Sequence, residues 1–314
     1  MLSVYNILME LTTGENDKGR RLDRILRKAL PEHPLPLLHR LMRQGHVLVN
    51  GKPAKAQDRI DSGAKISIPL KDAVKPSPSI IRLPSPEIIW QDCGLLAVNK
   101  PAGLAVHGLT NGKASPSLDA IVRSFLAEKL PSSLSFRPGP LHRLDKPSSG
   151  IVIFSTSIEG ARLFSSLMRE RKVRKTYLAI VEGNVEKEEI WEDLLVRDKD
   201  KKKTFISDNV SGVGKTAITK IKPLAAASVK GTQYSLVTAE IATGRTHQIR
   251  AQAASRRRPL MGDRKYGGHG KDGFFLHAWK LEFLNFTIEA PLPQAFKEKI
   301  AALFGEIVLL TNNG

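Results

Sequence analysis

A stretch rich in proline and serine constrains the fold of this chain more than any other feature of its sequence. It runs from residue 71 to 86 and holds three serines among four prolines, Pro76, Pro78, Pro84 and Pro86. Proline fixes φ and has no backbone N–H to donate, so the stretch is predicted to be a stiff, extended linker. We therefore expect a small domain over residues 1–70 and a larger one over residues 87–314.

The small domain combines two short helical patterns with a tight strand pattern. Apolar residues recur with helical spacing, namely Leu22, Ile25, Leu26 and Ala29 in the first helix and Leu38, Leu41 and Met42 in the second. The stretch HVLVNGKPA then predicts a strand that ends in a turn at Asn50 and Gly51, and AKISI predicts a second strand. We expect a small α/β-meander domain.

The charge of the chain favours an anionic partner. The 314 residues include 49 Lys and Arg against 31 Asp and Glu, a formal net charge of +18. Such an excess is typical of proteins that bind nucleic acid. An anionic membrane is the alternative, but no long apolar or basic amphipathic segment supports it. In the small domain the basic residues lie mainly on the faces opposite the apolar stripes, so we expect RNA contacts from Arg21, Arg24, Arg40 and Arg43.

The cysteine content and the N-terminal segment indicate the cellular compartment of the protein. Cys93 is the only cysteine, which excludes an internal disulfide framework and a zinc site built on several thiolates. The first residues include Glu10 and show no small-residue cleavage pattern, so no signal peptide is predicted. We expect a cytoplasmic protein.

The larger domain has short strands and helices without a regular βαβ alternation, which predicts an α+β fold with a mixed, mainly antiparallel sheet. Thr156 and Glu159 have capping-box spacing, and they precede a helical apolar stripe of Ala161, Phe164, Leu167 and Met168. Farther along, Thr246 is expected to cap a helix that begins at His247.

The segment HRLDKPSSG, residues 142–150, is the first of three stretches that point to chemistry. It precedes the apolar run Ile151–Phe154, which predicts a buried strand, so a rigid element would hold Asp145 in place. An aspartate is ionised at neutral pH and is available as a nucleophile or a base. The alternative is an Asx turn in which Asp145 only accepts hydrogen bonds from the backbone.

The other two stretches are GRTHQIR, residues 244–250, and RKTYLAIVEG, residues 174–183. A strand–turn–helix junction exposes backbone donors to anions, and Arg245 and Arg250 add positive charge there. The alternative is a basic patch that only positions phosphate. Tyr177 opens a strand, where tyrosine is more often a half-buried packing residue than a catalytic one.

Together with NKPAGLAVHG and LHAWKLEF, these stretches resemble the RluA family of RNA pseudouridine synthases from about Glu87 to Ile300. Ser148 stands where the family usually has threonine, a change that keeps the hydroxyl group, and Pro147 is a less expected neighbour. Residues 18–69 resemble the S4-type RNA-binding domain, although Ala64 stands where that family usually has an acidic residue.

The resemblance implies an isomerase that rearranges uridine within RNA in a central RNA-binding cleft, with no cofactor and no metal. It assigns the catalytic carboxylate to Asp145, an ion pair with that carboxylate to Arg250, and a position against the uracil ring to Tyr177. Whether Asp145 attacks the sugar, or removes a sugar proton so that a glycal forms, stays open.

The target uridine must be flipped out of the RNA, and Arg143 is the candidate to fill the vacated stack. Other expected RNA contacts are His142, Lys172, Arg174, Lys175, Arg245, His247, Arg256, Arg257 and Arg258. The substrate is expected to be structured RNA, large-subunit rRNA first and tRNA second, bound by a monomer. The alternative from another class is a non-catalytic rRNA-binding or ribosome-assembly factor.

Overall fold

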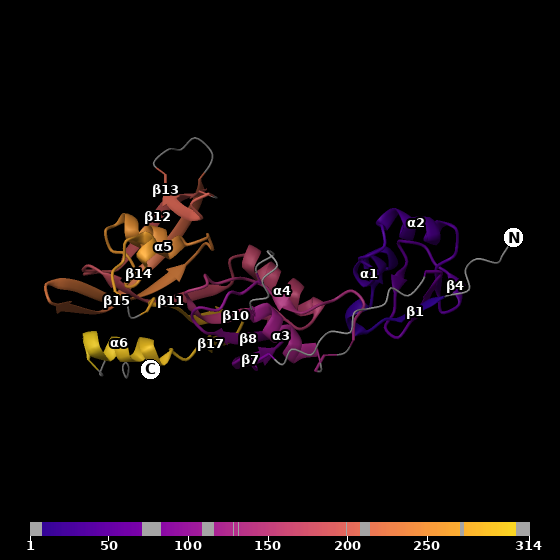
Figure 1. Ribbon diagram of the computed structural model, residues 1–314, viewed down its shortest axis with the longest axis horizontal. Helices are drawn as coiled ribbons and strands as arrows, with labels where there is room; N and C mark the ends of the chain where they lie inside the picture. The colour runs from indigo at the N-terminus through magenta and orange to yellow at the C-terminus, as the bar shows by residue number, and fades with distance from the viewer. Residues whose placement is uncertain are drawn as a thin grey trace.

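The computed structural model describes residues 8–70, 83–108, 116–127, 129–130, 132–198, 200–207, 214–270 and 273–305. A small N-terminal unit, residues 8–70, lies at one end of an elongated molecule, and a larger C-terminal unit, residues 83–305, forms the rest (Figure 1). Most of the predicted linker, residues 71–82, lies outside the described residues, so the linker stays a prediction. No helix among the described residues is long and apolar enough to cross a membrane.

The N-terminal unit has its own apolar core between two helices and a small sheet. Its elements are β1 (Met9–Thr12), η1 (Glu15–Asp17), β2 (Arg20–Arg21), α1 (Leu22–Ala29), α2 (Leu35–Arg43), β3 (Leu48–Val49), β4 (Lys52–Pro53), β5 (Arg59–Ile60) and β6 (Lys65–Ile68). The strands pair in the order β1-β6-β3-β4, with β2 and β5 as a separate pair. Asn50 and Gly51 both have positive φ between β3 and β4, which confirms the predicted turn.

The C-terminal unit is built on one sheet, to which eleven strands of its described residues contribute. Nine strands follow a continuous path, in the order β13 (Lys203–Ile206), β12 (Glu189–Asp198), β14 (Lys215–Val229), β15 (Thr232–Ile241), β11 (Arg174–Glu182), β16 (Leu276–Phe283), β10 (Ser149–Ser155), β8 (Leu95–Lys100) and β7 (Ile88–Asp92). Two shorter strands pair off this path, β17 (Phe286–Glu289) with β16 and β9 (Gly139–Pro140) with β10. Among the described strands, only the pairing of β10 with β16 is parallel, which confirms the predicted mixed, mainly antiparallel sheet.

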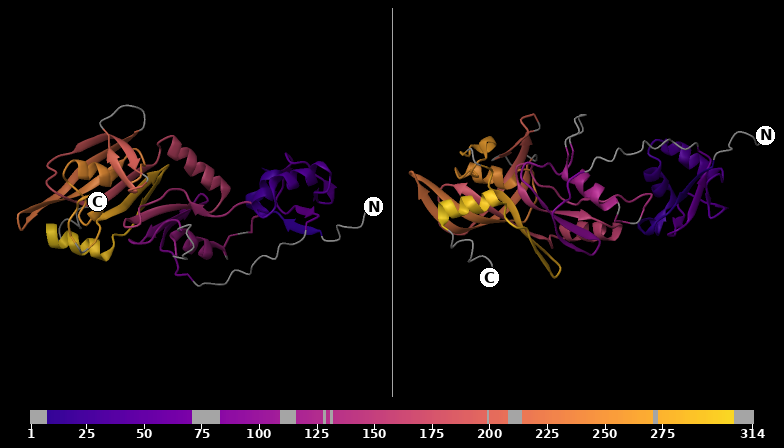
Figure 2. Two further views of the ribbon diagram at one scale, coloured as in Figure 1. Left: turned by 45° about the horizontal axis from the view of Figure 1, so that its top comes forward. Right: turned by 60° about the horizontal axis from the view of Figure 1, so that its bottom comes forward.

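Helices cover both faces of this sheet, and alternating side chains of each central strand serve the two faces. In β11, Ala179 and Val181 share a core with α5 (Gln248–Ser255), whereas Leu178 and Ile180 share one with α6 (Gln294–Phe304). Figure 2 shows α5 and α6 on opposite sides of the strands. In β10, Ile151 and Ile153 pack with α4 (Ile158–Arg169), whereas Val152 and Phe154 pack with α3 (Leu118–Ala127). The strands are therefore buried on both faces, as the apolar run in the sequence predicts.

Both predicted helix caps lie one residue too early. The N-cap of α4 is Ser157, whose hydroxyl accepts a hydrogen bond from Gly160 N at 3.0 Å, and not Thr156. The N-cap position of α5 is His247, in a left-handed conformation, and not Thr246. In place of a hydroxyl cap, the Gln248 side chain accepts a hydrogen bond from Arg245 N. Short polar side chains adjacent in the sequence are equivalent as cap candidates until the backbone is known.

Gly150 lies in the parallel pairing of β10 with β16, opposite Ala278. Its φ is +108°, and its Cα faces Ala278 so closely that an added Cβ would lie 2.2 Å from Ala278 O and 2.6 Å from Ala278 N. Glycine is the residue that fits both the dihedral angle and the close approach.

We expect Gly150→Ala to lower the free energy of unfolding by more than about 2 kcal/mol, since the clash is with backbone and cannot be relieved by a rotamer change. The matched control is Gly231→Ala, because Gly231 also has positive φ (+79°) but has open space around it. That change is expected to cost about 1 kcal/mol. Urea denaturation followed by circular dichroism measures both, and equal losses would contradict the steric argument.

Candidate active site

The loop that carries Asp145 lies between β9 and β10 and is tied to the end of β8. Within the loop, Ser148 N donates to Asp145 O at 3.1 Å. From the turn after β8, Gly103 N donates to Lys146 O at 2.8 Å. Leu144 and Ser148 are buried on either side of the half-buried Asp145. The loop is therefore fixed by backbone hydrogen bonds and by burial of its flanking side chains.

Lys100, at the end of β8, supports this loop from inside the protein. Its side chain is fully buried, and its ammonium group donates to three backbone carbonyls, Pro101 O (2.9 Å), Leu104 O (2.8 Å) and Lys146 O (3.3 Å). Burial lowers the pKa of Lys100 to about 8, and the nearby Asp145 carboxylate partly opposes this shift. The lysine positions the loop and adds positive charge behind the carboxylate.

The Asp145 carboxylate is paired with Arg250, which lies 105 residues later in the sequence. Arg250 Nη1 donates to Asp145 Oδ2 at 2.9 Å, and the two side chains are 7% and 16% exposed. The same guanidinium makes two further hydrogen bonds to Asp263, from Nε to Oδ2 at 2.7 Å and from Nη2 to Oδ1 at 2.8 Å. Burial alone would lower the pKa of Arg250, but the two carboxylates outweigh burial and raise it. Arg250 is thus a permanently charged bridge between a buried carboxylate and one that faces the cavity.

His247 lies on the other side of Asp145. Its left-handed backbone (φ +53°) directs the ring inward, so that Nε2 is 3.7 Å from Asp145 Oδ2 and Nδ1 is 2.9 Å from the Tyr266 hydroxyl. Burial, together with the positive charges of Arg250 and its neighbours, lowers the pKa of His247 to about 4 although Asp145 opposes this. The imidazole is therefore neutral at neutral pH.

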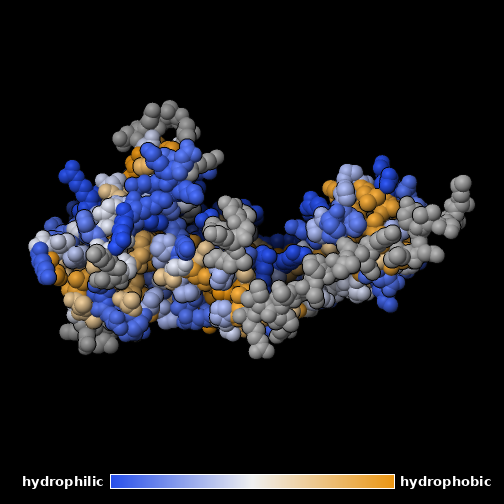
Figure 3. Space-filling view, viewed as in Figure 1, coloured by the Kyte–Doolittle hydropathy of each residue, from blue (hydrophilic) through white to orange (hydrophobic). Residues whose placement is uncertain are grey.

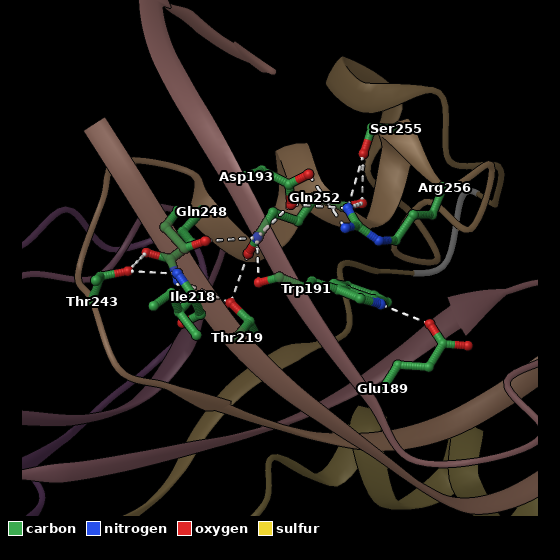
Figure 4. Close-up of polar contacts among 11 residues, drawn as sticks. Glu189, Trp191, Asp193, Ile218, Thr219, Thr243, Gln248, Gln252, Ser255 and Arg256 are labelled. Carbon is green, nitrogen blue, oxygen red and sulfur yellow. Dashed lines mark hydrogen bonds and ion pairs between the residues drawn. The ribbon is translucent and has the colours of Figure 1, made fainter. Parts of the chain in front are cut away.

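The helix that carries Arg250 is attached to the sheet by two glutamine side chains (Figure 4). Gln248 and Gln252 are one helical turn apart on the same face of α5. Gln248 Nε2 donates to Ile218 O and to Thr219 Oγ1, at 3.0 and 2.9 Å. Thr219 Oγ1 in turn donates to Gln252 Oε1 at 2.6 Å, and Gln252 Nε2 donates to Trp191 O at 3.0 Å. These buried hydrogen bonds fix α5 on β12 and β14 and thereby fix Arg250.

Tyr177, near the start of β11, lines a cavity of about 250 Å³ together with Asp145, Arg250 and His247. A register shift between β11 and β16 falls at Tyr177, and such bulges commonly redirect a side chain beside an active site. Burial, and then the Asp145 carboxylate, raise the pKa of Tyr177 well above its usual range. The side chain is therefore a neutral phenol at neutral pH.

Four predicted RNA contacts also line this cavity, namely His142, Arg143, Lys175 and Arg245. Arg143 and Arg245 are exposed, whereas Lys175 is half-buried and burial lowers its pKa. His142 also makes contacts within the protein, because its Nε2 accepts a hydrogen bond from Ile153 N at 3.1 Å and its ring stacks on Phe164. Burial lowers the pKa of His142 to about 3, so it is a neutral residue that holds the loop onto β10.

The remaining predicted contacts lie outside the cavity, and several are held by carboxylates. Arg256 makes two hydrogen bonds to Asp193, at 3.0 and 3.3 Å, and Arg258 Nη1 is 2.7 Å from Glu189 Oε1. Their geometry therefore supports a structural role rather than the predicted contact with phosphate. Lys172 and Arg174 are exposed and face Glu170 and Glu240, and four further arginines are exposed or half-exposed on the surface, namely Arg21, Arg40, Arg43 and Arg257. Arg24 is exposed on α1.

Asp263 and Lys100 were absent from the prediction. Asp263 lies in the segment GDRKYGG and Lys100 in NKPAG, where glycine and proline next to a charged residue are the only local signal. The described residues contain no group of three His, Cys, Asp or Glu side chains arranged to hold a metal ion. The cavity thus combines one carboxylate, one fixed guanidinium, a neutral imidazole and a neutral phenol, with cationic residues at its rim.

Comparison with known proteins shows the family to which the chain belongs. A sequence profile of RNA pseudouridylate synthases matches residues 94–255, which is more than half of the chain and includes Asp145, Tyr177 and Arg250. The chain belongs to the RNA pseudouridylate synthase family. A profile of the S4 domain matches residues 20–66, within the N-terminal unit. The chain is therefore an RNA-modifying isomerase with an S4 domain, as its motifs predicted.

Individual relatives agree with this assignment. The chain is 30% identical over 298 residues to ribosomal large subunit pseudouridine synthase C of Vibrio vulnificus (strain CMCP6), which covers 88% of this chain and 89% of the relative. It is 35% identical over 224 residues to tRNA pseudouridine synthase C of Vibrio parahaemolyticus serotype O3:K6 (strain RIMD 2210633), covering 65% of this chain and 87% of the relative. The fold is shared with human RNA pseudouridylate synthase domain containing 4, at a TM-score of 0.56 and 22% identity over 68% of this chain and 91% of that one.

The buried ammonium of Lys100 predicts an alkaline loss of pseudouridine synthase activity. Lys100 has a pKa of about 8 in the fold, and above that pH a neutral amine can donate to only two of its three carbonyl partners. The loop that carries Asp145 then loses a support, so the rate of tritium release from RNA labelled at uridine C5 should fall as pH rises through about 8. Lys100→Met, which has no titrating group there, should show a lower rate without that fall.

The free energy of unfolding should not fall over the same pH range. Because the pKa of Lys100 is lower in the folded chain than in the unfolded one, the unfolded chain binds more protons between the two values, and this group adds to stability as pH rises there. A thermal unfolding series over the same pH range separates the two effects. The same alkaline fall in Lys100→Met would contradict the assignment.

Proposed function

We propose that Asp145 is the catalytic carboxylate of this enzyme and that structured RNA, first of all large-subunit ribosomal RNA, is its substrate. The observation that carries the proposal is the chain of contacts Asp263–Arg250–Asp145, which holds one carboxylate at the wall of a cavity. A structural aspartate in a turn would be expected to accept hydrogen bonds from the backbone, whereas the contacts of this carboxylate are with Arg250 and His247.

The reaction rearranges uridine without gain or loss of atoms. The bond between ribose C1′ and base N1 breaks, the uracil turns, a bond from C1′ to C5 forms, and the proton lost from C5 is balanced by one gained at N1. Attack of Asp145 on C1′ and removal of a ribose C2′ proton both require a charged, immobile carboxylate next to the sugar. Arg250 supplies both properties, because it stabilises the charge and fixes the geometry.

The neighbouring side chains fit complementary roles. A neutral Tyr177 ring can face the uracil, and its hydroxyl can accept the C5 proton only by passing its own proton on. Arg143 is exposed at the rim of the cavity, where a guanidinium plane can stack in place of the flipped nucleotide. His247, neutral and 3.7 Å from Asp145, limits the directions in which the carboxylate can turn.

The extent of the two alignments favours ribosomal RNA over tRNA. The Vibrio vulnificus enzyme that is named for the ribosomal large subunit aligns over 88% of this chain, whereas the relative named for tRNA aligns over 65%. Transfer RNA remains the second candidate, and the monomeric state and cytoplasmic location stay predictions.

Asp145→Asn should reduce tritium release from C5-labelled large-subunit rRNA by at least about a thousandfold, because the amide is neither a nucleophile nor a base. RNA affinity should stay near that of the wild type, since the side chain keeps its shape. Glu289→Gln is the matched control and should release tritium normally, because its ion pair with Lys280 is on the surface. A wild-type protein that binds rRNA but releases no tritium would instead indicate a non-catalytic assembly factor.

Tyr177→Phe tests the phenol separately from the ring. Loss of the hydroxyl should lower the single-turnover rate on the order of a hundredfold if that group transfers the C5 proton. RNA affinity should change little, because the ring remains to pack on the base. Tyr177→Leu removes the ring as well and should also weaken binding. A Tyr177→Phe rate equal to that of the wild type would assign Tyr177 to packing alone.

A further inference from the structure

The N-terminal unit is attached to the C-terminal unit by a buried carboxylate. Asp17, which is fully buried, accepts hydrogen bonds from Leu134 N (2.9 Å), Ser133 Oγ (2.8 Å) and Ser135 N (3.0 Å), and a further one from Ser135 Oγ. We call these contacts the Asp17 latch. Burial opposes the charge of Asp17, but the hydrogen bonds outweigh burial and lower its pKa.

Other contacts reinforce the latch. Asn16 Oδ1 accepts a hydrogen bond from Ile158 N in the first turn of α4, at 3.0 Å, and Leu134 packs against the core of the N-terminal unit. Gly14 approaches the backbone of the C-terminal unit so closely that an added Cβ would lie 1.9 Å from Ser132 O. The two units therefore meet through a specific, closely packed contact.

Beside the latch, the two units enclose a cavity of about 970 Å³, which we call the interunit groove. Its wall on the N-terminal unit carries six cationic side chains, Arg20, Arg21, Arg24, Arg27, Lys28 and Arg59. Its wall on the C-terminal unit carries three more, Arg123, Arg137 and Arg162. The described residues that line the groove include no aspartate or glutamate. Figure 3 shows hydrophilic side chains gathered in the saddle between the two units.

Some of these charges are used within the protein, and others are free. Arg21 pairs with Asp23, Arg123 pairs with Asp119, and Arg20 donates to Ser135 O and Oγ. Five others are exposed and make no ion pair or side-chain hydrogen bond with any described residue, namely Arg24, Arg27, Lys28, Arg137 and Arg162.

Three of the unpaired cations act on Arg20. Burial lowers the pKa of Arg20, and the positive charges of Arg162, Arg24 and Arg27 lower it further, against the opposing effect of Asp17. Arg162 belongs to α4 of the C-terminal unit, so the repulsion crosses between units. A concentration of like charge that the protein does not neutralise is an attractive site for a polyanion.

We propose that the interunit groove binds the phosphodiester backbone of double-helical RNA, at a site separate from the cavity that takes the target uridine. This inference rests on the proposed action of the enzyme on structured RNA. Grooves for single strands add aromatic side chains on which bases stack, whereas Phe136 is the one aromatic residue among the described residues of this lining. Arginine and lysine without stacking rings fit phosphates, whose positions follow the shape of the helix and not its sequence.

The Asp17 latch allows the interunit groove to select RNA by shape. Because it fixes the groove relative to the C-terminal unit, an RNA must present a helix at a set position from the uridine that enters the cavity. The enzyme then selects its substrate by shape, in addition to any contacts with the flipped base.

Binding of the full-length protein to a blunt RNA duplex of arbitrary sequence, long enough to span about 16 base pairs, tests the proposal. Two double variants each remove two unpaired cations, Arg24→Ala with Arg27→Ala from one wall and Arg137→Ala with Arg162→Ala from the other. Each should weaken binding on the order of tenfold at moderate salt and lower the salt slope by about 2, or about 1 for each lost phosphate contact.

The matched control is Lys187→Ala with Lys222→Ala, which makes the same change of charge at exposed residues of the C-terminal unit outside the groove. It should change the affinity by less than about twofold. Wall variants that bind like the wild type, or a control that loses as much as they do, would overturn the proposal. A single strand of the same sequence that binds through the same arginines as tightly as the duplex would overturn the assignment to double-helical RNA.

Asp17→Asn tests the latch without removing a groove cation. It should weaken duplex binding while far-ultraviolet circular dichroism stays that of a folded chain. Ser133→Ala, which removes one of the hydrogen bonds to Asp17, should have a smaller effect in the same direction. Duplex binding by Asp17→Asn equal to that of the wild type would overturn the fixed geometry. The duplex assay requires no turnover and is therefore independent of tritium release from rRNA. The proposed RNA site in the groove and the proposed catalytic function can thus be refuted separately.

Discussion

The guanidinium of Arg250 is the interaction on which the candidate site depends. It is buried, it carries a permanent charge, and its hydrogen bonds divide between Asp263 inside the protein and Asp145 at the cavity. A buried ion needs opposite charges and hydrogen-bonding partners around it, because desolvation costs several kcal/mol for each ion. Asp263 supplies that compensation in the interior, and the glutamine contacts of α5 hold the arginine in position. Asp145 can therefore remain at the surface of a cavity and still be immobile.

The sheet explains how residues distant in sequence reach this point. Asp145 precedes β10, Tyr177 lies in β11, and Arg250 lies in the helix after β15. Strands β10 and β11 are separated by β16 alone, so the loop before β10 and the start of β11 lie near the same part of the sheet. The cavity forms where these segments meet α5. The Lys100 ammonium at the end of β8 then completes the support from the remaining side.

The sequence predicted the helices and strands well, because the spacing of apolar residues follows the local backbone conformation. The predicted strand AKISI corresponds to β6, and the apolar run Ile151–Phe154 lies in β10, because alternation and apolar runs report burial directly. Both helix caps were placed one residue early, since neighbouring polar side chains compete for the same donors. The pairing of Asp145 with Arg250 came from the resemblance of the motifs, not from periodicity.

The roles of several residues could not be predicted from the sequence, because these roles depend on partners that are distant in the chain. Lys100 resembles a surface lysine until its carbonyl partners are known, one of which lies 46 positions away. Arg256 and Arg258 resemble free basic residues, yet their carboxylates stand 63 and 69 positions earlier, on β12. Five cations of the interunit groove lie within residues 20–28, but the three on the C-terminal unit come from separate segments, and no continuous run in the sequence marks those three.

The parallel pairing of β10 with β16 has a consequence for how the protein is made. Ser149 Oγ and His277 Nδ1, 2.8 Å apart, are 128 positions apart in the chain, so joining the two strands closes a very long loop. A ribosome has already synthesised Asp145, Tyr177 and Arg250 before β16 emerges to link the two halves of the sheet. Nascent chains that stop short of β16 therefore contain these three residues without the strand that joins β10 to β11.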